Sequence, residues 1–204
     1  MSVAAADLIG LFRSHRLRVF TTSDLATLAG FDGVAAAQAL GRLETKGLVC
    51  RLKRGVWANR LAPGLNPYEA VAALRAPWPC YVSLYSVLAD RGIIAEIPQG
   101  VYAVSASLPR SFRTPLASYS IHHLPERFMW GYEFSDTGEA SYPEADAEKA
   151  FLDLAYLSLI PRSKLALPRP RGRWALDRPK LGAYARRFGF APLTKLLRKE
   201  KLLG

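Results

Sequence analysis

The sequence is poor in the residues that hold disulfide frameworks and metal sites. It has two cysteines, two methionines and three histidines among 204 residues. Cys50 and Cys80 lie far apart and neither belongs to a CxxC pair, so neither a disulfide framework nor a zinc site is indicated. The cysteine usage therefore predicts a reducing, cytoplasmic setting and no metal.

Long hydrophobic runs are missing as well. No stretch reaches the roughly 18 to 20 apolar residues that a bilayer requires. The opening stretch "MSVAAADLIGLFRSH" has neither a charged n-region nor an uninterrupted apolar segment, both of which a secretory leader needs. We therefore expect a soluble, unprocessed protein with no membrane partner.

Signatures of catalysis are scarce. There is no G-x-S-x-G elbow near Ser83 or Ser86 and no glycine loop that would cradle a phosphate. His122 and His123 are adjacent, so on a strand they point to opposite faces and do not share a metal. The acidic residues around Glu144 favour the positive end of a helix dipole. We predict that the protein is not an enzyme and has no catalytic residues, metal ligands or cofactor.

Positive charge, in contrast, is abundant and unevenly placed. The net charge is +11, with nine basic against four acidic residues in 1–60, six against eleven in 61–160 and thirteen against two in 161–204. Such an excess favours a polyanionic partner, which is nucleic acid, an acidic protein or a membrane surface. Two basic ends around an acidic middle predict parts with separate roles.

The first part, residues 1–62, has the element order of a winged helix-turn-helix. Apolar spacing predicts a helix over 3–14, packed by Ile9 and Phe12. A short strand at 19–21 precedes a helix capped by Thr22 or Ser23. A third helix then begins at Asp32.

The third helix ends at Gly47, a natural C-cap, and a hairpin follows it. In "LVCRLKRGVWA", Leu48, Cys50 and Leu52 alternate with polar or smaller neighbours, and Gly55 allows a tight turn. Helix, strand, helix, turn, helix and hairpin, in this order, predict a DNA-binding domain.

A helical wheel places a polar stripe on the third helix opposite its apolar one. Gln38 can pair with adenine and Arg42 with guanine in the major groove, and small Ala35 and Ala39 would let the backbone approach closely. The basic hairpin would grip phosphate or an adjacent minor groove. The plainer alternative is a solvated helix face and a tip that is basic for solubility. The predicted DNA-binding residues are Thr22, Ser23, Ala35, Gln38, Arg42, Thr45, Lys46, Arg51, Lys53 and Arg54.

The second part, residues 63–160, is predicted to be a small mixed-sheet α/β domain. Asn66 is the expected N-cap of a helix through Leu74. Strands are expected at 80–82, in "GVYAVSAS" and "ASYSIHHL", near Phe134 and at 140–142, and a helix is expected in "SLYSVLADRG". On the helix "EADAEKAFLDLAYLSL", Lys149 can pair with Asp153 one turn on. A structural ion pair is favoured over a polar site formed with Glu148.

Three stretches in order resemble the AbiEi-type antitoxin family of type IV toxin–antitoxin, abortive-infection operons. These are "GLVCRLKRGVWA", "CYVSLYSVLADRG" and "AEKAFLDL", within a resemblance that spans about residues 5 to 160. Val87 and Ala147 depart from the family pattern. The resemblance implies a repressor that binds repeats upstream of its own operon and neutralises a nucleotidyltransferase-like toxin.

The last part, residues 161–204, is a basic Pro/Arg-rich linker followed by two short helices, at 177–188 and 192–203, that pack on the second domain. Trp174 is a packing anchor or, less simply, a stacking surface for a nucleotide. The whole chain is therefore read as a double-stranded-DNA-binding repressor and antitoxin, acting as a monomer or as a dimer on paired half-sites. The alternatives are a stand-alone regulator, a protein-interaction module without a toxin partner, a protein module that sequesters a toxin without needing DNA, and a general RNA or membrane-surface binder that uses the basic tail.

Overall fold

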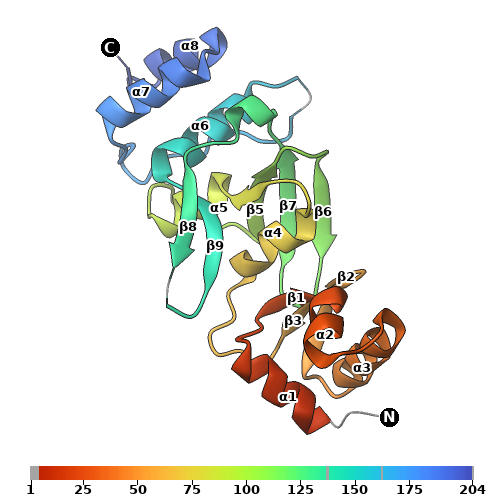
Figure 1. The fold of residues 1–204 in the computed structure, drawn as a ribbon. Helices are drawn as coiled ribbons and strands as arrows, with labels where there is room; N and C mark the ends of the chain where they lie inside the picture. The colour runs from red at the N-terminus through yellow and green to blue at the C-terminus, as the bar shows by residue number, and fades with distance from the viewer. Residues whose placement is uncertain (1–4, 137, 162, 204) are drawn as a thin grey trace.

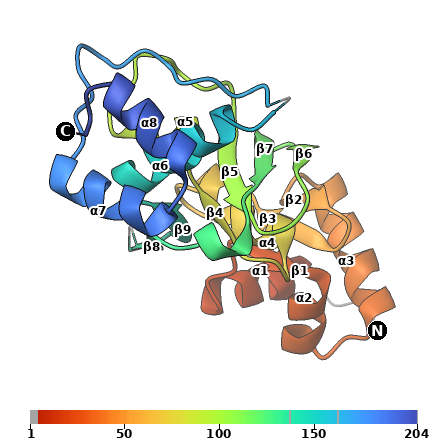
Figure 2. The same cartoon turned by 90° about the horizontal axis from the view of Figure 1, so that it is seen from above.

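The structure, a computed structural model, describes residues 5–136, 138–161 and 163–203. These residues form a mixed α/β fold with eight α-helices, a three-stranded antiparallel sheet and a six-stranded mixed sheet. Figures 1 and 2 show the three N-terminal helices, within residues 5–45, at one end of the molecule and the two C-terminal helices, within residues 178–199, at the other, with the mixed sheet between them. The predicted fold class is confirmed at this level.

The N-terminal part and its sheet come first in the chain. Its elements are α1 (Ala5–Ser14), β1 (Val19–Thr21), α2 (Thr22–Ala29), α3 (Gly33–Thr45), β2 (Val49–Lys53) and β3 (Val56–Asn59). The strands pair antiparallel in the order β1-β3-β2. The predicted order of helices, strand and hairpin is therefore confirmed.

The next part of the chain contains the strands of the mixed sheet and the helices that connect them. Its elements are η1 (Pro67–Glu69), α4 (Ala70–Arg75), β4 (Cys80–Val82), α5 (Leu84–Asp90), β5 (Val101–Ser105), β6 (Arg110–Arg113), β7 (Ser118–His123), η2 (Glu126–Phe128), β8 (Tyr132–Asp136), β9 (Ser141–Ala145) and α6 (Ala147–Ser158). The strand order in the sheet is β6-β7-β5-β4-β9-β8. The chain ends with α7 (Arg178–Phe188) and α8 (Ala191–Lys199). No helix in the described ranges is long and apolar enough to cross a membrane.

Several sequence patterns predicted the local structure correctly. Asn66 caps η1: its Oδ1 accepts a hydrogen bond from the Tyr68 amide at 2.9 Å, and the Glu69 carboxylate accepts one from the Asn66 amide at 2.7 Å, as in a capping box. The two strands expected from "GVYAVSAS" and "ASYSIHHL" are neighbours, β5 and β7, and they run parallel. Edge strand β6 has no counterpart in the prediction because its exposed Arg-Ser-Phe-Arg sequence lacks an apolar face.

The packing of α1 differs from the prediction. Leu8 and Phe12 are buried, whereas Ile9 is only half-buried. Leu8 and Phe12 are four residues apart and so lie one above the other on a single face, and Phe12 contacts Phe20 with ring centroids 5.2 Å apart. Ile9 lies one residue off that face. Residues 3 and 4 of the predicted helix are outside the described residues.

The small antiparallel sheet lies between two hydrophobic clusters. On one face, Val49 and Trp57 pack with α1, α2 and α3. On the other, Cys50, Leu52 and Val56 join the large cluster formed with the mixed sheet. The predicted boundary near residue 62 is therefore crossed by a continuous apolar core, and this contact fixes how α3 is presented.

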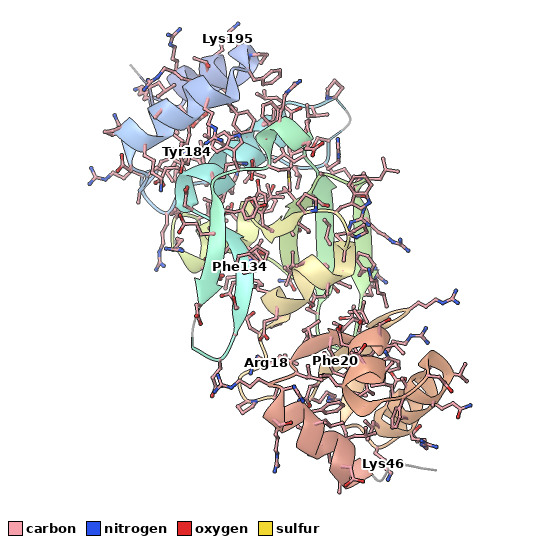
Figure 3. All side chains as sticks on the ribbon, in the orientation of Figure 1. Arg18, Phe20, Lys46, Phe134, Tyr184 and Lys195 are labelled. Carbon is pink, nitrogen blue, oxygen red and sulfur yellow. The ribbon has the colours of Figure 1, made fainter. Side chains whose placement is uncertain are left out.

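The C-terminal helices pack on the mixed-sheet part, as predicted. Leu181 and Phe188 of α7 and Leu193 of α8 are buried in the same large cluster. Trp174 lies against Phe151, with ring centroids 4.7 Å apart, so its indole is a packing anchor. Lys46 and Lys195 lie at opposite ends of the molecule (Figure 3), so the basic tail is remote from α3.

Candidate nucleic-acid interface

Helix α3 has one buried face and one polar face. Its first turn is fixed by Asp32, whose Oδ1 accepts a hydrogen bond from the amide of Ala35 at 2.7 Å, as an N-cap residue does. Its last turn gives way to Gly47 at φ +71°, a left-handed conformation that suits glycine. The buried residues of α3 are Ala36, Ala39, Leu40 and Leu43.

The predicted polar stripe of α3 faces solvent. Gln38, Arg42 and Lys46 are exposed, and none of their side chains makes a salt bridge with a described residue. Thr45 is exposed too, but its hydroxyl donates to the carbonyl of Gly41 at 3.0 Å. The stripe therefore offers one amide and two free cations to a partner.

The small residues of α3 are placed differently from the prediction. Ala39 is 2% exposed and belongs to the core, because it lies next to Leu40 and one turn before Leu43. Ala35 is half-buried. Only Ala35 remains beside the polar stripe as a place where a partner's backbone can approach.

The predicted caps of α2, Thr22 or Ser23, are wrong by one and two residues. The N-cap is Thr21, whose hydroxyl accepts from the Asp24 amide at 3.1 Å while the Asp24 carboxylate accepts from the Thr21 amide at 2.7 Å. Thr22 instead accepts the indole N–H of Trp57 at 3.0 Å, which ties α2 to the hairpin. Ser23 is exposed in the first turn of α2.

The basic residues of the hairpin separate into two groups. Arg51 and Arg54 are exposed, and the Arg51 guanidinium lies 5.8 Å from the centre of the Trp57 ring. The Arg51 amide donates to the carboxylate of Glu44 at 3.1 Å, so the hairpin is fastened to α3. Arg51 and Arg54 are therefore exposed cations of the hairpin, and Arg51 lies next to Glu44 of α3.

Lys53, the third predicted basic residue of the hairpin, is half-buried, unlike Arg51 and Arg54. The register of the β2–β3 ladder shifts between Arg51 and Lys53, an irregularity that turns side chains to the other face. The Lys53 ammonium donates to the carbonyl of Leu74 at 2.9 Å. Burial, followed by the charges of Arg75 and Arg110, lowers the pKa of Lys53.

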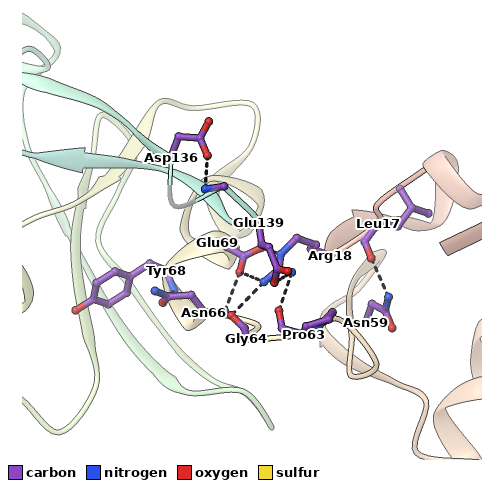
Figure 4. A network of polar contacts seen from close by, with 11 residues as sticks. Leu17, Arg18, Asn59, Pro63, Gly64, Asn66, Tyr68, Glu69, Asp136 and Glu139 are labelled. Atoms are coloured by element: carbon purple, nitrogen blue, oxygen red, sulfur yellow. Dashed lines mark hydrogen bonds and ion pairs between the residues drawn. The ribbon is translucent and has the colours of Figure 1, made fainter. Parts of the chain in front are cut away.

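Arg18, which the sequence analysis did not single out, fixes the N-terminal part against the mixed sheet (Figure 4). Its guanidinium pairs with both oxygens of Glu69, at 2.7 and 3.0 Å. It also donates to the carbonyls of Pro63 and Gly64, at 2.8 and 3.1 Å. A bidentate pair of this kind is geometrically specific, so Arg18 holds the N-terminal part in place against the mixed-sheet part. A lone arginine before a short strand carries no sequence signal for this role.

The predicted ion pair between Lys149 and Asp153 is present, and both side chains are fully buried. The Lys149 ammonium also donates to the Tyr81 hydroxyl at 2.7 Å, and the Asp153 carboxylate accepts from Tyr81 and Ser83 at 2.9 Å each. Burial lowers the pKa of Lys149 and raises that of Asp153, while each charge opposes the shift of the other. Glu148 pairs instead with Lys180 of α7 at 3.1 Å.

The histidine pair is arranged as the strand geometry requires. His123 is exposed and His122 is half-buried, with its ring parallel to that of Tyr102. Burial lowers the pKa of His122. Among the described residues, no three His, Cys, Asp or Glu side chains gather as metal ligands would.

Comparison with models of known protein families gave no match, and comparison with curated proteins gave none either. The resemblance to AbiEi-type antitoxins therefore rests on the three stretches in the sequence. Two of these stretches meet in space, because Tyr81 and Ser83 bond to Lys149 and Asp153 in one buried cluster.

Proposed function

We propose that the protein is a DNA-binding transcriptional regulator, and that residues 1–62 are a winged helix-turn-helix whose α3 enters the major groove. The observation that carries the proposal is the exposed stripe of Gln38, Arg42 and Lys46 on a helix whose opposite face is buried. Amide and guanidinium groups are suited to reading adenine and guanine edges. The proposed role is repression of the protein's own promoter.

The hairpin supports this role with charge. Arg51 and Arg54 are exposed on the hairpin and carry no ion pair with any described residue. Phosphate contacts of this kind fix register on the duplex and make binding sensitive to salt. We assign base reading to α3 and backbone contact to the hairpin.

The test is a salt-dependent titration of the full chain on its own upstream promoter and on scrambled DNA of equal length. We expect the promoter to bind at least about a hundredfold more tightly, a minimum that lies below the preference of about 10³-fold or more typical of specific regulators. Gln38→Ala and Arg42→Ala should remove most of this preference. Arg198→Ala is the matched control, because Arg198 is exposed on α8 at the opposite end of the molecule.

Two results would contradict the proposal. Equal binding to both DNAs that disappears at high salt would mean that the positive charge binds nucleic acids electrostatically and without sequence preference. No binding to either DNA would move the search to a protein partner. The stoichiometry on the promoter separates a monomer from a dimer on paired half-sites.

A second proposed role is that of an antitoxin for a nucleotidyltransferase-like toxin. It is supported by the family resemblance, two of whose stretches build the buried cluster around Lys149 and Asp153. The check is co-expression with a neighbouring nucleotidyltransferase gene. Restored growth would support the role, whereas unchanged toxicity would leave a stand-alone regulator.

A further inference from the structure

A groove of about 580 Å³ opens where the hairpin meets the mixed-sheet part. Lys53 contributes from β2, Arg75 and Trp78 from the end of α4 and the loop after it, and Arg110 from the start of β6. The volume lies within the range of sites for small molecules. Of the predicted DNA-binding residues, Lys53 alone lines this groove, and neither the α3 stripe nor Arg51 and Arg54 do.

The groove is lined by positive charges that no acidic side chain in its lining neutralises. Three basic side chains line it and no carboxylate does. Lys53, Arg75 and Arg110 take part in no salt bridge with a described residue. The charges of Arg75 and Arg110 act on Lys53 from close by. Like charges held together in a partly buried place are stabilised when an anion joins them.

Arg75 is the least expected of the three cations, since it is only 9% exposed. Its Nη2 donates to the Ser107 hydroxyl and, at 2.9 Å, to the Leu108 carbonyl. Its Nε is buried and has no hydrogen-bond partner among the described residues. A buried donor without a partner costs free energy, so the contacts of Arg75 with the described residues leave part of its donor capacity unused.

The groove also has an apolar rim. Trp78 is 54% exposed and Leu108 is 78% exposed, although large apolar side chains are ordinarily covered. An exposed indole next to cations suits a flat ring that carries an anionic group. The rim therefore adds selectivity for an aromatic ligand to the anion site.

We propose that this groove binds a phosphorylated ligand of mononucleotide size. Its phosphoryl oxygens accept hydrogen bonds from Lys53, Arg75 and Arg110, and its ring stacks on Trp78. A ligand small enough to enter the groove reaches Arg75, whereas a duplex backbone rests on exposed cations such as Arg54. The site goes beyond the proposed DNA binding and does not depend on it.

The test is calorimetric titration of the full chain with three probes: pyrophosphate, AMP and ATP. We expect saturable binding of ATP, with an affinity tighter than about 1 mM. Arg110→Ala should weaken ATP and pyrophosphate about tenfold, the loss typical of one charge-assisted hydrogen bond. Trp78→Ala should weaken ATP about tenfold and leave pyrophosphate within about twofold, because only ATP has a base to stack.

Arg113→Ala is the matched control, since Arg113 is an exposed arginine on the same strand β6 but outside the groove. It should leave all three affinities within about twofold. Absence of saturable binding of every probe would overturn the proposal, as would equal losses in Arg110→Ala and Arg113→Ala. If duplex DNA alone binds, and Arg110→Ala and Trp78→Ala weaken it, the groove belongs to the DNA interface instead and the proposal fails.

Discussion

Helices α3 and α6 are of similar length and both carry charged residues, but they use their charges in opposite ways. In α3 the charged side chains face solvent and one stripe is buried. In α6 every residue from Glu148 to Leu157 is buried, including Lys149 and Asp153. Residue type alone therefore does not tell whether a lysine binds a partner or holds the fold.

The difference follows from what surrounds each charge. A hydrated arginine on α3 exchanges water and counterions for a phosphate or a base at little cost. Lys149, in contrast, has been moved out of water and is held by Asp153 and Tyr81. A buried pair repays its desolvation only while both partners are present. Charge removal should therefore reduce binding in α3 and stability in α6.

The largest expected effect is on the α6 pair. Asp153→Ala leaves the Lys149 ammonium buried without its counter-charge, and we expect a loss of about 3 to 5 kcal/mol in the free energy of unfolding. Urea denaturation at neutral pH measures this loss. The paired change of Lys149→Met with Asp153→Leu should cost less than Asp153→Ala alone, because no unpaired charge remains. If the single variant unfolds at the wild-type midpoint, α6 does not depend on the pair.

Arg42→Ala tests the other half of the comparison. Stability should stay within about 0.5 kcal/mol of wild type, as for an exposed side chain outside any network. Affinity for the specific promoter site should fall by about 1 to 3 kcal/mol, while binding to scrambled DNA changes less. Equal losses on the two DNAs would mean that Arg42 contacts phosphate and not a base.

The hairpin provides the same contrast within neighbouring residues. Arg54→Ala should lower affinity for every sequence and reduce the slope of log K against log salt by about one, since it removes one phosphate contact. Lys53→Ala should leave that slope unchanged, because the Lys53 ammonium is bonded to the Leu74 carbonyl in the groove. An equal change of slope in both variants would place Lys53 on the duplex.

The sequence predicted elements better than it predicted contacts between them. Caps and turns are local, so Asp32 and Asn66 were predicted correctly as N-caps, and Gly47 lies one residue after Lys46, the C-cap of α3. The α2 cap was missed because three hydroxyl residues follow one another, and only the Asp24 carboxylate distinguishes Thr21. The edge strand β6 was missed because its residues are mostly exposed.

Long-range placement explains the remaining differences at the candidate interface. The polar stripe of α3 follows from helix geometry alone, so Gln38 and Arg42 were placed correctly on the exposed face. Lys53 was placed by alternation, which fails where the β2–β3 register shifts. Arg18 and Arg75 obtain their roles from Glu69 and from Ser107, residues far away in the chain. The pattern of residues in a single sequence does not indicate which distant residues pair in this way.

His122 of β7 is titratable and half-buried, so its exposure is intermediate between that of the charged residues of α3 and that of Lys149 and Asp153 in α6. Its substitution has the smallest expected effect. Burial lowers its pKa below the ordinary value of 6.5, so between these two values the unfolded chain binds a proton that the folded chain does not. The stability contributed by neutral His122 is therefore complete above about pH 6.5 and is lost as the pH falls toward the lowered pKa. His122→Phe keeps a ring beside Tyr102 and removes the titration, so the difference in unfolding free energy between the variant and wild type should change only below about pH 7. Parallel curves from pH 8 to pH 5 would show that the strand does not oppose protonation of His122.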